Sequence, residues 1–188
     1  GDPAVVLAGI GASAEQVDAI RQAYGLDQPL PIQLGRWYWG LLHGDLGVSV
    51  LMGSAVTQVI AERLPATLSL TAIAFVISVV FGVLGGILAA LNQDRWFDRL
   101  VLAGSAFGLS IPSFWLAILL IVLFSVNLNW LPAGGYVPLA QDPIGWAKSL
   151  ILPAISLALL QIGYLARITR TALVDVLSQD YIRTAAAK

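Results

Sequence analysis

Residues 64–91 read LPATLSLTAIAFVISVVFGVLGGILAAL, a run of 28 residues without a charged side chain. A helix of this length extends roughly 42 Å, which is enough to cross a bilayer with some tilt. Two further uncharged runs follow, at residues 100–126 and 149–166. These runs predict three membrane-spanning helices and an all-α fold, that of a polytopic α-helical membrane protein.

The composition of the whole chain agrees with a membrane protein. Of the 188 residues, 58% are hydrophobic and 11% are charged, whereas a soluble domain has about 25% charged residues. The net charge of −1 argues against a nucleic-acid partner, because phosphates require a basic face. The absence of cysteine and the single histidine, His43, leave little for a metal cluster. We therefore expect a lipid bilayer around the chain, with no metal and no cofactor bound to it.

Three glycines in the first run predict close helix packing. Gly82, Gly85 and Gly86 carry no side chain, so another helix can approach them closely, as spans do when they associate in lipid. The alternative is that these glycines are merely tolerated in the helix and have no packing role.

A proline near the middle of the second run predicts a bend. Pro112 removes one backbone donor, so we expect a kink that leaves the carbonyl of Gly108 free. If this kink shapes a path through the membrane, Ser110 and Ser113 are candidates to line it with Pro112. A kink that only helps the helices to pack is the alternative. In the third run, Pro153 is expected in the first helical turn, where proline is tolerated.

The first 63 residues are the only long region of mixed polarity. Ser13 and Gln16 have the spacing of a capping box, and the helix that they open should stop near Gly25. A second helix carries the aromatic cluster at residues 36–39, which suits either a membrane–water boundary or a small soluble core. Residues 54–63 have helical periodicity, typical of a short helix lying along the interface.

The distribution of basic residues predicts the orientation in the membrane. The loop at 92–99 and the segment 167–188 lie on one side, and the segments 1–63 and 127–148 lie on the other. Near the spans, the first side has five basic residues and the second has two: Arg95, Arg99, Arg167, Arg170 and Arg183 against Arg63 and Lys148. Since basic residues favour the cytoplasmic side, we expect the C-terminal segment in the cytoplasm and the first region outside.

The C-terminal segment, residues 167–188, reads RITRTALVDVLSQDYIRTAAAK. Ser178 or Asp180 can cap a new helix start, which predicts a polar helical hairpin. The small residues 184–187 then allow another protein to approach the backbone closely. An ordinary solvated helix after a span is the alternative.

The chemistry missing from the sequence is also informative. None of the three runs contains Asp, Glu, Lys, Arg or His, whereas ion-coupled carriers usually place such groups within the membrane. The phosphate-binding pattern G-x-x-x-x-G-K-[ST] does not occur, and no nucleophile–base pair is recognisable. We therefore expect no catalytic residues and a chain that is not itself an enzyme.

Seven pieces of the sequence, in order, carry a family resemblance. They are GDPA at 1–4, YGLDQPLPIQLGRWYWGLLHGDLG at 24–47, ERLPATLSL at 62–70, IPSFW at 111–115, WLPAGG at 130–135, ILPAISLAL at 151–159 and ARITRTALVDVLSQDYIRTAAAK at 166–188. Over nearly its whole length, the chain resembles the permease subunits of ATP-binding-cassette importers of the dipeptide, oligopeptide and nickel type.

The resemblance implies a domain organisation. Residues 1–63 would be an extracytoplasmic region with short amphipathic helices, and residues 64–188 would belong to a type I importer (MetI-like) transmembrane domain. One span would precede Gly1 and two or more would follow Lys188, so the chain is expected to be a fragment.

The resemblance also implies a docking site for an ATPase. The segment 167–188 would be the cytoplasmic coupling segment with the EAA-type motif, in which Arg183, Thr184 and Ala185 replace Glu-Ala-Ala, and the glycine of the motif would follow Lys188. The docking helix would consist of Asp180, Tyr181, Ile182, Arg183, Thr184, Ala185, Ala186, Ala187 and Lys188.

The partners follow from the same resemblance. They would be a second homologous permease subunit, two ATPase subunits that hold ATP and magnesium, and an external substrate-binding protein. The location would be a bacterial or archaeal inner membrane. A channel or secondary transporter and a membrane scaffold without a transport path are the alternative functions, and the sequence does not distinguish peptide from metal chelate as the substrate.

Overall fold

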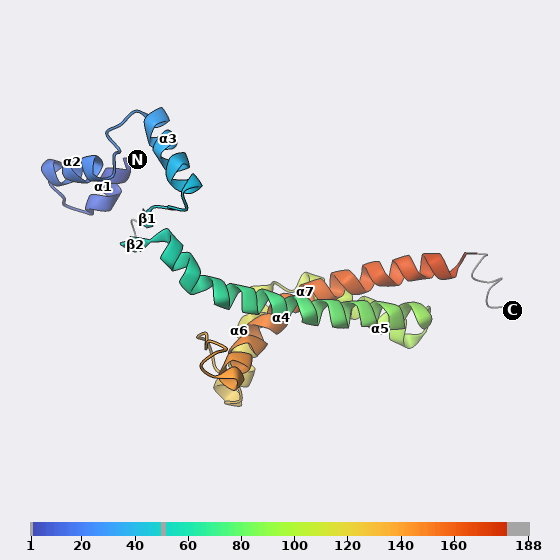
Figure 1. The fold of residues 1–188 in the computed structure, drawn as a ribbon. Coiled ribbons are helices and arrows are strands. Elements are labelled where there is room, and N and C mark those ends of the chain that lie inside the picture. Colours follow the sequence, from blue (N-terminus) through green and yellow to red (C-terminus); the bar gives the residue numbers. More distant parts are fainter. Residues whose placement is uncertain (1, 50–51, 180–188) are drawn as a thin grey trace. The chain divides into compact units, whose positions relative to one another are not determined.

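The computed structural model describes residues 2–49 and 52–179 of the chain. Its contacts divide the chain into two units, residues 1–64 and 65–188, and both units consist mainly of helices (Figure 1).

The first unit is built from short helices, and the start of the second one is capped as the sequence predicts. Ser13 accepts a hydrogen bond from the backbone N–H of Gln16, whose side chain accepts one from the backbone N–H of Ser13, so the predicted capping box is confirmed. The helix ends just before Gly25, which has a φ of +66°. The elements are α1 (Pro3–Ala8), α2 (Ala14–Ala23), α3 (Leu30–Leu42) and an antiparallel pair of two-residue strands, β1 (Val48–Ser49) and β2 (Ser54–Ala55).

The remaining helices include two long ones, of 36 and 35 residues, and three shorter helical segments. They are α4 (Val56–Leu91), α5 (Trp96–Ser110), α6 (Ser113–Leu120), a π-helical continuation at Ile121–Asn127, and α7 (Pro143–Leu177). The segment 54–63 does not form a separate interfacial helix, because α4 runs without interruption from Val56 through Pro65 into the first apolar run.

Two of these helices, α4 and α7, are long and apolar enough to cross a membrane. A third span is obtained if α5 and the helical stretch Ser113–Asn127 are counted as one broken span. The all-α fold predicted from the three uncharged runs is confirmed.

The second apolar run is broken rather than kinked. The helix α5 ends at Ser110, Ile111 has an extended backbone, and Pro112 is the residue before the first turn of α6. The chain bends by 98° between these two helical pieces. A proline disfavours helical conformation in the residue that precedes it, and Ile111 here leaves the helical region completely. The predicted bend at Pro112 is present, but it is a break between two helices and not a kink within one helix.

The helix α7 is longer than the third apolar run in both directions. Its start is capped by Asp142, whose carboxylate accepts a hydrogen bond of 3.0 Å from the backbone N–H of Ile144. Pro153 consequently lies in the helix interior and not in the first turn as predicted. At the other end, residues 167–177 continue the helix, and Ser178 is its C-terminal cap. Ser178 thus ends a helix, whereas the sequence analysis named it, with Asp180, as a candidate for a helix start.

Candidate functional site

Small residues bring α4 and α7 into close contact, and the ribbons of the two helices cross in Figure 1. A methyl group added at Gly82 would lie 2.7 Å from Cβ of Leu165, and one at Gly86 would lie 2.6 Å from the carbonyl oxygen of Ala166. Both distances are too short for real contacts, so only glycine fits. The predicted close packing is confirmed at these two positions. At Gly85 the nearest atom is 4.0 Å away, which is an ordinary contact.

The helix α5 approaches α7 from another side by the same means. A methyl group at Gly163 would lie 2.9 Å from the carbonyl oxygen of Ser105, and one at Gly108 would lie 3.4 Å from the side chain of Leu159. No hydrophobic driving force acts between helices in lipid, so helices associate by close packing, and small residues let their backbones approach. The helix α7 is therefore the element around which the others are packed.

A cavity of about 510 Å³ lies where α4, α6 and α7 meet. This size is within the range of small-ligand sites. Its wall is mainly apolar but contains five polar side chains from the three helices, none of them charged. They are Thr71 and Ser78 of α4, Ser113 of α6, and Gln161 and Tyr164 of α7.

The three candidate path residues have different positions in the structure. Ser113 lines the cavity. Ser110 does not, and its hydroxyl donates a hydrogen bond of 2.8 Å to the carbonyl of Ala106 on its own helix. Pro112 is exposed at the break. The proposed docking residues Asp180–Lys188 lie outside the described residues.

A buried ion pair joins α5 to α7. Asp98, in the first turn of α5, is 1% exposed. Its two carboxylate oxygens accept hydrogen bonds from Nε and Nη2 of Arg170, at 2.5 and 2.6 Å. The backbone N–H of Asp94 donates a further bond of 3.0 Å. This forked arrangement fixes the orientation of both side chains as well as their distance.

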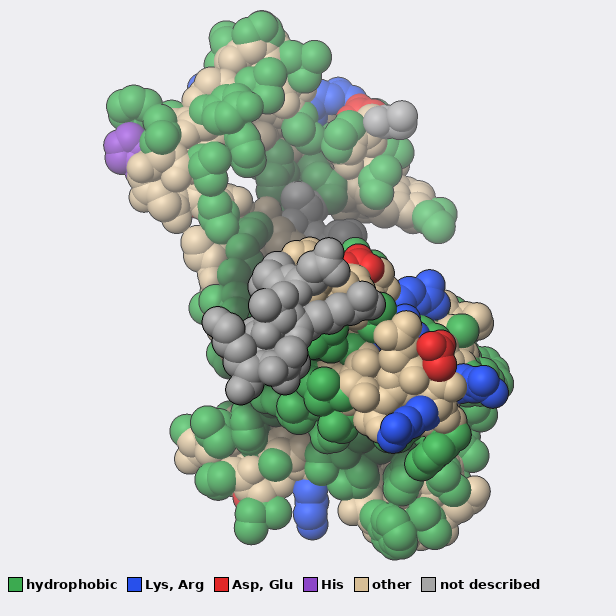
Figure 2. Space-filling view, turned by 90° about the vertical axis from the view of Figure 1, so that its right-hand side faces the viewer, with side chains coloured by type: hydrophobic (Ala, Val, Ile, Leu, Met, Phe, Trp, Pro, Cys, Tyr) green, Lys and Arg blue, Asp and Glu red, His purple; other side chains and the backbone are tan. Residues whose placement is uncertain are grey.

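The sequence analysis missed this pair. Asp98 and Arg170 are 72 residues apart; Arg170 entered only the count of basic residues near the spans, and Asp98 was not considered. The sequence did contain a signal for this pair. It has an aspartate in the first turn of one helix and an arginine just beyond the span of another. Figure 2 views this end of the second unit and shows acidic and basic side chains among hydrophobic ones.

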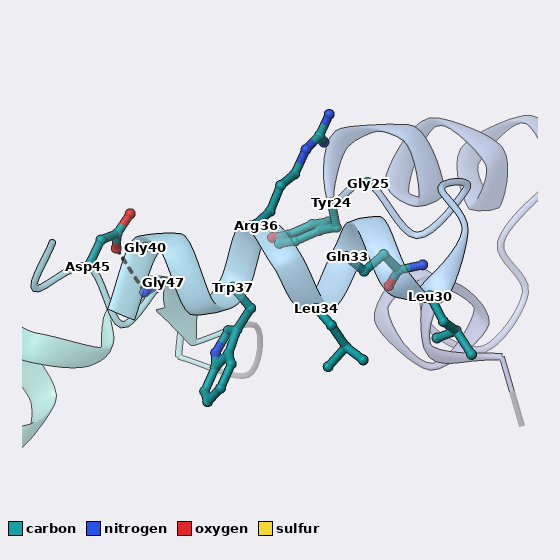
Figure 3. A pocket seen from close by; sticks show the side chains of 10 residues that line it. All are labelled: Tyr24, Gly25, Leu30, Gln33, Leu34, Arg36, Trp37, Gly40, Asp45 and Gly47. Atoms are coloured by element: carbon teal, nitrogen blue, oxygen red, sulfur yellow. Dashed lines mark hydrogen bonds between the residues drawn. The ribbon is translucent and has the colours of Figure 1, made fainter. Parts of the chain in front are cut away.

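A hollow in the first unit lies along α3 (Figure 3). Arg36 and Trp37 point to opposite sides of the helix. The carboxylate of Asp45 accepts a hydrogen bond from the backbone N–H of Gly47 and stabilises the turn. The amide of Gln33 donates to the carbonyls of Leu26 and Gln28. These polar groups hold the local backbone and do not converge on one point.

No group of three His, Asp or Glu side chains that could hold a metal ion is found within residues 2–49 and 52–179. The polar groups of the cavity are hydroxyls and one amide, which can donate and accept hydrogen bonds without carrying a charge.

Comparison with known protein families gives two matches. Residues 82–188 match the family described as "Binding-protein-dependent transport system inner membrane component". Residues 1–71 match the N-terminal family of the same membrane components. The chain belongs to this family. The resemblance inferred from the sequence motifs is therefore confirmed, and the family description assigns its members to the inner membrane.

Individual members of the family are similar over the whole chain. A Brucella abortus protein with the provisional name peptide transport system permease protein is 55% identical over 188 residues, which are 100% of this chain and 60% of that protein. A Sinorhizobium fredii protein, provisionally named a peptide ABC transporter permease, is 42% identical with the same coverage. The glutathione transport system permease protein GsiC of Escherichia coli is 43% identical over 100% of this chain and 59% of its own length.

The chain thus spans about three fifths of the length of these relatives. All three organisms are bacteria, which agrees with a bacterial inner membrane and gives no support to the archaeal alternative.

Proposed function

We propose that this chain is part of the membrane-spanning permease subunit of an ATP-driven importer of di- or oligopeptides. The observation that carries the proposal is the 55% identity over the full chain to a relative named as a peptide transport permease. Matches to both family segments, at residues 1–71 and 82–188, support it.

The described helices suit this role. A broken span next to an uncharged polar cavity provides hydrogen-bonding groups at membrane depth without an Asp, Glu, Lys, Arg or His side chain in the wall. A helix that breaks within a membrane is tolerated where its free backbone groups line a cavity.

Within this function, the permease itself is non-catalytic and binds no cofactor. ATP and magnesium are held by two ATPase subunits, and a second homologous permease subunit completes the path. An external binding protein delivers the substrate to residues 1–63. The helix at Asp180–Lys188 docks on an ATPase, so that ATP binding shifts the equilibrium between outward- and inward-open states.

Co-purification tests the assembly. The tagged full-length protein is co-expressed with the products of its neighbouring genes and extracted in mild detergent. It is expected to retain an ATPase subunit. Addition of peptide-loaded binding protein to the purified complex in lipid is expected to raise ATP hydrolysis several-fold. A complex without an ATPase would support a channel, a secondary carrier or a scaffold instead.

A further inference from the structure

The cavity between α4, α6 and α7 contains polar groups without partners. Gln161 and Tyr164 line the cavity from α7, and Thr71 lines it from α4. None of these three side chains forms a hydrogen bond within the described parts of the chain. The side chain of Ser78 differs, because it donates to the carbonyl of Ala74 at 2.6 Å.

The positions of these groups on α7 are not scattered. Leu157 lies four residues before Gln161, and Leu160 lies four residues before Tyr164, so these cavity-lining residues share one helix face. Gln161 lies inside the third apolar run, within residues 149–166. An amide without a partner is costly in hydrocarbon, so such a group faces water, protein or a ligand rather than lipid.

The chemistry of Gln161 matches one ligand class closely. A glutamine amide offers two N–H donors and one carbonyl acceptor, and a peptide bond offers one donor and one acceptor. The phenol of Tyr164 can donate or accept, and the apolar wall accommodates side chains of different shape. No charged side chain lines the cavity, so the charge of a substrate side chain has no partner there.

We propose that this cavity is a substrate contact site that recognises the main-chain amides of a peptide, with Gln161 as the principal hydrogen-bonding residue and Tyr164 as the second. The site binds different peptides through the group that they share. This inference rests on the proposed function and adds to it a place and a chemistry for substrate contact.

Variants of the full-length permease test the site. The complex is reconstituted in lipid with saturating peptide-loaded binding protein, and uptake per ATP hydrolysed is measured. Gln161→Leu is expected to lower this ratio by about 5- to 10-fold, the range expected for loss of one or two hydrogen bonds. Tyr164→Phe is expected to lower it by about 3-fold. Ser156→Ala is the control, because Ser156 is buried on α7, donates within its own helix and does not line the cavity.

A modified substrate tests the chemistry. A dipeptide with an N-methylated peptide bond lacks the N–H group that would donate a hydrogen bond to the carbonyl oxygen of Gln161. With occupancy of the binding protein confirmed, wild-type uptake of this peptide is expected to fall several-fold, and the fall is expected to be absent in Gln161→Leu. Equal sensitivity of both proteins would overturn the assignment of Gln161.

A photoreactive peptide tests the location of the site in the wild-type protein, so the result does not depend on the folding of a variant. A dipeptide with a benzophenone side chain, irradiated during turnover of the wild type, is expected to label residues 71–78 or 157–165. Labelling confined to other segments would overturn the inference alone. Absence of peptide uptake by the wild type would overturn the proposed function, and this inference with it.

Discussion

Arg170 of α7 binds both carboxylate oxygens of Asp98 of α5, and the same turn of α7 lies against Gly86 of α4. A methyl group at Gly86 would lie 3.1 Å from the backbone nitrogen of Arg170. Three helices therefore meet around one arginine, next to the segment that leads to the proposed docking helix.

Removal of one partner of the ion pair is expected to destabilise the protein. Arg170→Leu leaves the carboxylate of Asp98 buried without a counter-charge, which costs about 3 kcal/mol or more. The expected result is a clearly lower melting temperature of the purified full-length protein in detergent. Arg167→Leu on the same helix is the control, since Arg167 is exposed and has no hydrogen-bond or ion-pair partner among the described residues.

The double variant Asp98→Leu with Arg170→Leu separates the charge from the packing. Replacing a buried ion pair by apolar residues often leaves the stability unchanged. The double variant is therefore expected to recover most of the stability lost in Arg170→Leu. A double variant as unstable as Arg170→Leu would show that the packing of these side chains, not the unpaired charge, determines the loss.

The glycines of α4 give a second prediction with an internal control. Gly86→Ala places a methyl group 2.6 Å from a backbone oxygen of α7, and such overpacking costs about 1–3 kcal/mol. Gly85→Ala has room at 4.0 Å and gains up to about 1 kcal/mol of helix propensity. The two variants are expected to change the melting temperature in opposite directions. Equal effects would contradict the close contact of α4 with α7.

These features differ in how far the sequence predicts them. Glycines 82 and 86 lie in an uninterrupted apolar run, so their packing role follows from local sequence and the nature of lipid. The effect of Pro112 was underestimated, because a proline shifts the residue before it as well as removing its own donor. The pair of Asp98 and Arg170 depends on which helices become neighbours, and charge counting contains no such information.

The orientation of the chain in the membrane is testable by labelling. The basic residues near the spans predict that Gln28 lies outside and Ser178 inside. In the full-length protein, with any native cysteines replaced, a cysteine at position 28 is expected to react with an impermeant reagent in intact cells. A cysteine at position 178 is expected to react only after permeabilisation. Reaction of both in intact cells would contradict the orientation.

The docking assignment predicts uncoupling by bulky residues. In Ala185→Trp or Ala186→Trp, the side chain is expected to force the ATPase away from the proposed helix Asp180–Lys188. Insertion into the membrane is expected to remain normal, because neither position lies in an apolar run, while uptake per ATP hydrolysed falls at least about 10-fold. Arg183→Glu tests the charge of the same helix separately. Normal coupling in all three variants would refute the assignment.

ATP-dependent movement of a peptide across the membrane is the most direct test of the central claim. The full-length protein and its partner subunits are reconstituted in proteoliposomes with the ATPase sites facing the bath, and the binding protein and a radiolabelled dipeptide are enclosed. We predict that magnesium and ATP drive the dipeptide out of the lumen, and that a non-hydrolysable ATP analogue does not. Dipeptide movement that is independent of ATP, or no movement with an active ATPase bound, would contradict the assignment of this chain to an ATP-driven peptide permease.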